Sequence, residues 1–254
     1  MAPPSALEDI KAQFTTAIDL IRKGAAEVVA QFNALVEQVK RWAWLLGGAT
    51  MLWIKHNLDA AAAAIKKILA TAQEVLAHST PILSVITTSF EWISRVETPM
   101  SGVVATLAGT DADGSVNYGM DAWTGAAATA YSRKVGVQKA AAEDVVAKAE
   151  FMSAWLFKVA KGNIEYVAEL AKVVTKIAGK VVAALADAET VVGIPWAVSE
   201  LSNGVADIVE GGLNTLIDMG QKFVAAVGDV RDLAGKAGDQ SKLPHGTWPQ
   251  AVAG

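Results

Sequence analysis

Apolar side chains recur at every seventh position through the first part of the chain, with charged and polar residues between them. The main ladder consists of Leu7, Phe14, Ile21, Val28, Leu35 and Trp42. A second apolar position of the heptad is filled by Ile18, Ala25, Phe32 and Val39. Because seven residues are close to two turns of an α-helix, both sets lie along one face. The pattern predicts a long helix whose apolar stripe packs against other helices.

Helical spacing continues through most of the remaining sequence. Gly47 and Gly48 predict the first interruption, since each glycine costs a helix about 1 kcal/mol relative to alanine. A second helical run extends to about Ala77. Pro81 then stands at the start of a third run, and Thr98-Pro99 predicts a kink or a restart within it.

The second half of the chain is also helical in pattern. Residues 108–121 carry glycine, aspartate and asparagine without an apolar period, which predicts a long loop. A helical stretch follows from Ala126 to about Val191, with Gly162-Asn163 as its expected break. The last helix is expected from Pro195 to about Leu233. No segment alternates apolar and polar residues with a period of two, so no strand is expected.

These elements predict an all-α fold, an elongated bundle of long antiparallel helices. We expect one helical domain over residues 1–235, followed by a flexible, polar tail over residues 236–254. Within the domain, residues 5–77 form an N-terminal helical region. Residues 81–161 form a helical hairpin, and residues 163–235 contain the C-terminal helices.

Composition excludes several kinds of chemistry. The chain has no cysteine, so it has no disulfide, zinc-thiolate site or thiol nucleophile. It has 22 lysines and arginines against 26 aspartates and glutamates, and this slightly acidic balance gives no reason to expect nucleic-acid binding. The three histidines fall in different segments without a neighbouring ligand. Asp111 and Asp113 resemble the start of a calcium loop but lack its later carboxylates. We therefore expect no metal, no cofactor and no enzyme activity.

The most apolar window, residues 42–54, is a candidate partner or membrane surface. It contains 13 uncharged residues, whereas a membrane-spanning helix needs about 20. An alanine-rich stretch, residues 60–64, lies further along and lets another backbone approach closely. The residues assigned to this possible surface are Trp42, Trp44, Leu45, Leu46, Trp53 and Ala62.

A second constellation follows the expected loop. The sequence Trp-X-Gly-X-Ala-Ala-X-X-Tyr is formed by Trp123, Gly125, Ala127, Ala128 and Tyr131. This pattern resembles the WXG-motif superfamily of type VII secretion substrates of actinobacteria and Gram-positive bacteria. In physical terms, glycine permits a tight turn, tryptophan fills the end of a hairpin, and the alanines admit a close second helix. An ordinary helix start capped by Asp121 is the competing interpretation. If the hairpin interpretation holds, we expect Trp123 to be largely buried.

The resemblance implies export without a Sec signal peptide, and otherwise a cytoplasmic location. One departure weakens it, because actinobacterial substrates of this kind carry Tyr-X-X-X-Asp/Glu after the second helix. The fourth residues after the three tyrosines here are Ala122, Val135 and Leu170. Tyr166 does precede Glu169, but at a spacing of three. A partner chain must then supply the signal, or export by that system is wrong.

Two functional interpretations are consistent with the sequence. The first is a non-enzymatic interaction protein, a WXG-like substrate or effector of type VII secretion that binds a helical partner or weakly self-associates. The second is a membrane-active helical protein of the α-pore-forming kind, which rearranges to insert its apolar helices. Packing inside a bundle already explains long apolar stripes, so we favour the first interpretation and do not favour membrane contact.

Overall fold

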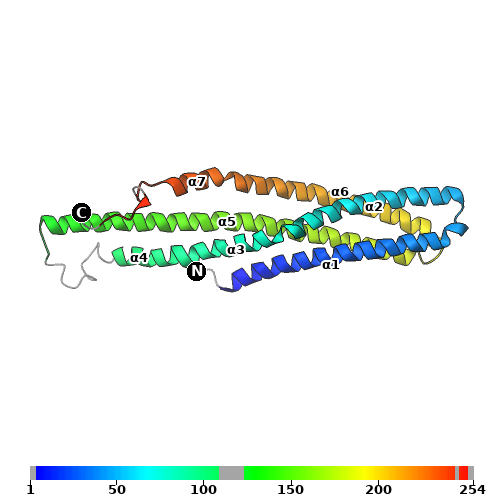
Figure 1. The fold of residues 1–254 in the computed structure, drawn as a ribbon, viewed down its shortest axis with the longest axis horizontal. Coiled ribbons are helices and arrows are strands. Elements are labelled where there is room, and N and C mark those ends of the chain that lie inside the picture. Colours follow the sequence, from blue (N-terminus) through cyan, green and yellow to red (C-terminus); the bar gives the residue numbers. More distant parts are fainter. Residues whose placement is uncertain (1–3, 109–122, 244–245, 251–254) are drawn as a thin grey trace. The chain divides into compact units, whose positions relative to one another are not determined.

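The computed structural model describes residues 4–108, 123–243 and 246–250, and it is all-α over these ranges, without a strand (Figure 1). Its α-helices are α1 (Pro4–Trp42), α2 (Gly48–Ala77), α3 (Ser79–Trp92), α4 (Thr98–Ala108), α5 (Ala126–Asp187), α6 (Gly193–Gly228) and α7 (Val230–Gly238). A 3-10 turn (Ala43–Leu45) separates α1 from α2, and a π-helical turn (Ile93–Glu97) separates α3 from α4. The helices pack as a bundle, as the apolar period predicts.

The chain divides into two compact units. Unit 1 comprises residues 1–7, 84–160 and 225–254, and unit 2 comprises residues 8–83 and 161–224. Helix α5 contributes its first 35 residues, 126–160, to unit 1 and the remainder to unit 2. The expectation of a single domain over residues 1–235 stays a prediction, because the units are joined by continuous helices.

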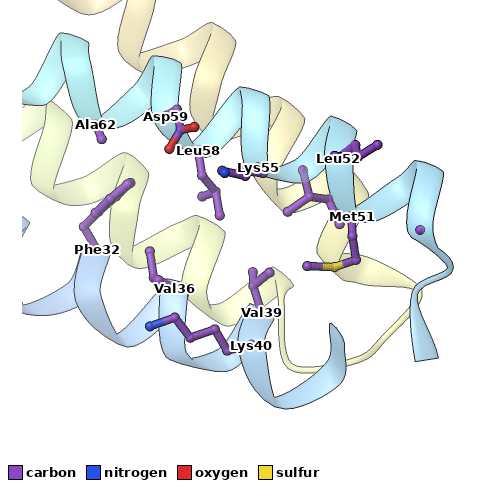
Figure 2. Close-up of a pocket in the computed structure, with 12 residues that line it drawn as sticks. Phe32, Val36, Val39, Lys40, Met51, Leu52, Lys55, Leu58, Asp59 and Ala62 are labelled. Atoms are coloured by element: carbon purple, nitrogen blue, oxygen red, sulfur yellow. The ribbon is translucent and has the colours of Figure 1, made fainter. Parts of the chain in front are cut away.

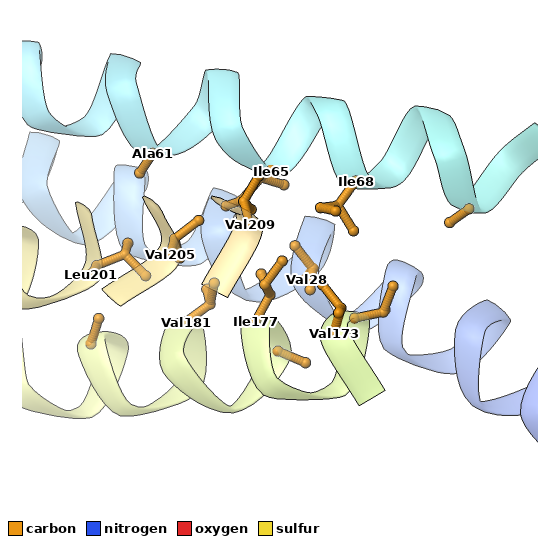
Figure 3. Packing of buried hydrophobic residues seen from close by; sticks show 14 of the residues in the cluster. Val28, Ala61, Ile65, Ile68, Val173, Ile177, Val181, Leu201, Val205 and Val209 are labelled. Atoms are coloured by element: carbon orange, nitrogen blue, oxygen red, sulfur yellow. The ribbon is translucent and has the colours of Figure 1, made fainter. Parts of the chain in front are cut away.

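Unit 2 has an aliphatic core to which α1, α2, α5 and α6 all contribute. Figure 3 shows side chains from these four helices meeting along one axis, with Val28, Ile65, Ile177 and Val205 among them. Branched side chains fill space densely and remove apolar area from water, at about 25 cal/mol per Å². The core therefore determines how these four helices are arranged.

The seven-residue ladder of α1 is confirmed as a buried seam. Phe14, Ile21, Val28 and Leu35 are each at most 1% exposed, and Trp42 packs partly buried against the same core. Glycine allows closer packing at two places. A Cβ at Gly24 would lie 2.9 Å from Val174 Cγ1, and one at Gly212 would lie 2.7 Å from Val173 Cγ2. Helices α1 and α6 therefore approach α5 more closely there than any larger side chain permits.

The turn predicted at Gly47-Gly48 is confirmed, but the break predicted at Gly162-Asn163 is wrong. Helix α5 runs without interruption through both residues. Gly162 is partly buried and its Cβ position lies 3.7 Å from the Phe223 ring of α6. Packing of this kind outweighs a helix penalty of about 1 kcal/mol.

Unit 1 is built from α3, α4, α7 and the first part of α5, and small residues dominate its interior. Ala141, Ala142 and Ala149 of α5 are each at most 1% exposed. The hydroxyl of Ser153 is also buried and donates a 2.7 Å hydrogen bond to the carbonyl oxygen of Ser89. A T-shaped pair, Phe90 and Phe157, packs with ring centroids 5.9 Å apart.

The tail predicted to be flexible from residue 236 is instead attached to α5 where it is described. Helix α7 extends to Gly238. Gln138 Nε2 donates a 2.9 Å hydrogen bond to the carbonyl oxygen of Pro249, and the ammonium of Lys148 donates to the carbonyl oxygen of Asp239. These backbone acceptors hold the segment against the helix.

Candidate functional site

An open apolar groove of about 520 Å³ lies between α1 and α2 in unit 2 (Figure 2). Helix α1 lines it with Phe32, Val36 and Val39, and helix α2 lines it with Met51, Leu52 and Leu58 among others. Gly48, the first residue of α2, lies at one end. The groove exists because residues beside the main seam of α1 are apolar as well, so its apolar face is wider than its partner helices cover.

The groove continues along the same two helices. A second hollow of about 370 Å³ shares Phe32 and Ala62 with the first and extends to Val29 on α1 and to Gln73 on α2. The lining residues of α1 thus span positions 29–40, about 17 Å at 1.5 Å per residue. This length corresponds to about three turns of a bound helix.

Charges on the rim of the groove are mainly positive. Lys40, Lys55 and Lys66 stand on the rim, against the single carboxylate of Asp59. Lys40 forms a 2.7 Å ion pair with Glu37, whereas Lys55 and Lys66 pair with no carboxylate among the described residues. The groove therefore combines an apolar floor with a net positive edge.

The chemistry that this lining offers is binding. The polar residues of the larger hollow are two lysines and one aspartate, and those of the second hollow are Asn33, Lys66 and Gln73, so neither lining has a histidine, serine or threonine. Such a set provides no hydroxyl nucleophile beside a base. Among the residues described, no three histidine or acidic side chains gather as a metal site. Asp111, Asp113 and His245 lie outside the described residues, so the calcium-loop and histidine expectations are not tested there.

The six residues predicted as a partner or membrane surface divide into buried and exposed members. Leu46 is 7% exposed and belongs to the core, and Trp42 packs against that core. Trp44 is 79% exposed, with Leu45 and Trp53 at 45% and 43%. Ala62 lies on the groove wall. These residues, which the sequence analysis assigned to one surface, thus belong in the structure to a groove, an exposed turn and the core.

The alanine stretch faces a different helix. Ala60, Ala63 and Ala64 line a hollow of about 480 Å³ between α2 and α6, together with Val209 and Leu213. The small side chains leave this space, as expected for an alanine surface. Lys67 and Glu210 place one charge of each sign on its edge.

The Trp-X-Gly motif lies on the surface where α5 begins. Gly125 has a φ of +99°, which favours glycine, and the helix starts at the next residue. Trp123 is 43% exposed and contacts only the Tyr131 ring among the aromatic side chains described, with centroids 5.5 Å apart. Ala127 is exposed as well. The expectation of a largely buried Trp123 is therefore wrong, because no described helix covers this turn of α5.

Sequence reasoning missed most of the groove. Val29 and Val36 each follow a ladder position by one residue, and with Phe32 they form a second stripe at helical spacing. That stripe was the available signal. Met51 and Leu58 could not be assigned to it, because their facing depends on how the turn between the two helices sets the start of α2.

Comparison with protein-family models, with curated proteins and with solved structures finds no match for this chain. The resemblance to the WXG superfamily accordingly rests on the five motif residues. Within the described part of the chain, none of the helices has the length and apolarity that crossing a membrane requires.

Proposed function

We propose that this protein is a non-enzymatic interaction protein whose α1–α2 groove binds an amphipathic helix of another protein. The groove carries the proposal, because it is an apolar channel with the length of about three helical turns and no described residue of the chain fills it. Binding of this kind places apolar side chains at positions i, i+3, i+4 and i+7 of the ligand into the groove.

The positive charges on the rim of the groove favour acidic residues on the polar sides of the bound helix. Lys55 and Lys66 form no ion pair with a described carboxylate, and they stand on the same side of α2, since they are eleven residues, close to three turns, apart. Acidic residues beside the apolar stripe of the ligand would meet them. Charge complementarity of this type contributes mainly to specificity and to the association rate.

A secretion role is the finer part of the proposal. The Trp-X-Gly pattern at Trp123 supports export by a type VII system, and its exposed position leaves the indole and the Tyr131 ring accessible to another chain. The missing Tyr-X-X-X-Asp/Glu signal would then be supplied by the partner that occupies the groove. Export that requires co-expression of this partner, and that is lost in Trp123→Ala, is the expected result.

The groove is tested by placing a photo-cross-linking amino acid at Val36 in the cells that produce the protein. A matched control places it at Glu27, an exposed residue of α1 that does not line the groove. We expect Val36 to cross-link to one amphipathic helical segment with acidic flanks. Equal cross-linking from both positions would contradict a groove-specific partner.

The segment identified in this way is then synthesised as a peptide for binding measurements. Ala62→Glu places a charge on the groove wall and should weaken binding at least tenfold, which is about 1.4 kcal/mol. Ala26→Glu makes the same change at an exposed site of α1 and should leave affinity within about twofold. A peptide that binds Ala62→Glu as tightly as the unmodified protein would refute the proposal.

A further inference from the structure

One end of unit 2 carries an exposed apolar tip, formed by its two interhelical turns and by the beginnings of α2 and α6 that follow them. Gln38 Nε2, near the end of α1, donates a 3.5 Å hydrogen bond to the carbonyl oxygen of Ala188, just after α5. This bond places the turn from α1 to α2 beside the turn from α5 to α6 (Figure 1). We call the exposed residues there the indole tip: Trp44, Leu45, Leu52, Trp53, Val192 and Trp196.

These exposed side chains stand next to residues that are buried. Val192 is 89% exposed, Trp44 79% and Trp196 57%. Their neighbours Leu46 and Ile194 are buried in the core of the unit. The apolar area that the tip leaves in water therefore adjoins packed core residues and is not the result of a loosely packed end.

The tip is also free of charge in both of its segments. Residues 42–54 and residues 190–199 contain no aspartate, glutamate, lysine or arginine. Charged residues of both signs follow immediately outside, with Lys40, Arg41 and Lys55 around the first turn and Asp187 and Glu189 before the second. Since charges of both signs surround the tip, it has no net attraction for a strongly charged partner surface.

The residue types and the exposure of the tip indicate what covers it. Apart from Leu52, none of its six residues lines the hollows between helices described above, where a helix would dock. A lipid surface can take up exposed apolar side chains without a complementary cavity. Tryptophan is the residue enriched at that depth, because its ring is apolar while its N–H remains close to polar headgroups.

We propose that the indole tip inserts into the interfacial region of a zwitterionic lipid bilayer, with Trp44 and Trp196 as its main anchors and with the helices intact. This membrane contact goes beyond the binding of a helical partner, and its main anchors, Trp44 and Trp196, do not line the groove, although Leu52 belongs to both surfaces. It differs from pore formation, because no helix enters the hydrocarbon core. The neutral tip predicts binding that does not depend on anionic lipid or on low salt.

The test is flotation of the full-length protein with phosphatidylcholine vesicles loaded with a dye. We expect the protein to float with the vesicles, the dye to be retained, and the partition coefficient to change less than twofold in about 0.5 M salt. Trp44→Ser combined with Trp196→Ser removes two exposed indoles that do not line the groove. This double variant should reduce the partition coefficient at least tenfold.

The matched control is Trp123→Ser combined with Trp248→Ser, which removes two exposed indoles from unit 1 and should leave partitioning within twofold. Ala62→Glu should also float like the unmodified protein, so failure of the groove proposal and failure of this one are distinguishable. Four results would overturn the inference: no flotation of the unmodified protein, equal flotation of the tip variant, flotation only with anionic lipid at low salt, or release of the dye.

Discussion

Unit 2 and unit 1 are both helical, but different side chains fill their interiors. The fully buried side chains of unit 2 include Phe14, Leu35, Leu170 and Ile177, drawn from two separate parts of the sequence. Among the described residues of unit 1, Ile86 is the one large side chain that is fully buried, and alanines and two serines make up most of the other buried residues.

The difference indicates two ways of holding helices together. In unit 2, burial of branched and aromatic carbon supplies most of the stability, at roughly 1.5–3 kcal/mol for each large side chain. In unit 1, close approach of alanine-rich helices is supplemented by directed contacts. Lys236 of α7 lies 3.9 Å from the centroid of the Phe151 ring, and Lys158 forms a 2.8 Å ion pair with Asp229. Exposed ion pairs contribute at most about 1 kcal/mol, so we expect unit 1 to be the less stable of the two.

The largest expected effect comes from matched truncations of one isoleucine in each unit. Ile177→Ala and Ile86→Ala remove the same atoms from sites that are each at most 1% exposed. Buried isoleucine-to-alanine changes cost about 2–5 kcal/mol, depending on how far the site collapses. We expect Ile177→Ala near the upper end of this range and Ile86→Ala near the lower end, measured by urea denaturation. Equal losses of stability, or a larger loss for Ile86→Ala, would contradict the proposed difference between the two interiors.

A second contrast uses adjacent glycines of α6 in unit 2. Gly212→Leu should destabilise by about 1–3 kcal/mol, because the new side chain meets Val173 in a tightly packed contact. Gly211→Ala has open space around its Cβ and should stabilise the helix by about 0.5–1 kcal/mol. Thermal melting measures both changes. A Gly212→Leu variant as stable as the unmodified protein would mean that the contact between α5 and α6 is not close-packed.

A third prediction addresses the polar interior of unit 1. Ser153→Ala removes a buried hydrogen bond to Ser89 and should cost about 1 kcal/mol. Hydrogen exchange of the α3 and α5 amides in unit 1 should increase, while exchange in the core of unit 2 stays unchanged. Unaltered stability would show that alanine packing alone holds unit 1.

The smallest effect is a dependence on alkaline pH in unit 2. Burial raises the pKa of the Tyr166 hydroxyl above its ordinary value, and the nearby charge of Glu74 raises it further. The unfolded chain therefore loses this proton at a lower pH than the folded chain does, and stability falls as pH rises above about 10. Tyr166→Phe should lose less stability than the unmodified protein between neutral pH and this range. An identical decline in both proteins would exclude Tyr166 as a cause.

The apolar period was sufficient to predict the helices and the seam of α1. It was not sufficient where contacts between distant segments, or an irregular turn, determine the structure. Gly162 resembled a helix break because its contact with Phe223 arises from a segment about 60 residues away. The exposure of Trp44 beside the buried Leu46 depends on the 3-10 turn, whose period of three residues is not that of α-helix.

The Trp-X-Gly motif shows a limit of another kind. Its glycine does permit the turn into α5, as the local chemistry predicts. Whether Trp123 is covered depends on what lies beside that turn, and five motif residues do not contain this information. The groove was predictable only in part. Its second apolar stripe on α1 was visible in the sequence, whereas its wall on α2 was not.

The order of segments in unit 2 also has a consequence for how the chain is completed during synthesis. Its core joins residues from 14–72 with residues from 167–216, and residues 84–160 belong to the other unit. At about 5–20 residues per second, a ribosome needs roughly 4–16 s to make this intervening segment. Throughout that interval the α1–α2 hairpin presents Phe14, Ile21 and Ile65 to solvent with no partner helices to cover them. Unit 2 can close its core only once residues 161–224 have been made, and its first hairpin is the segment that a chaperone would shield until then.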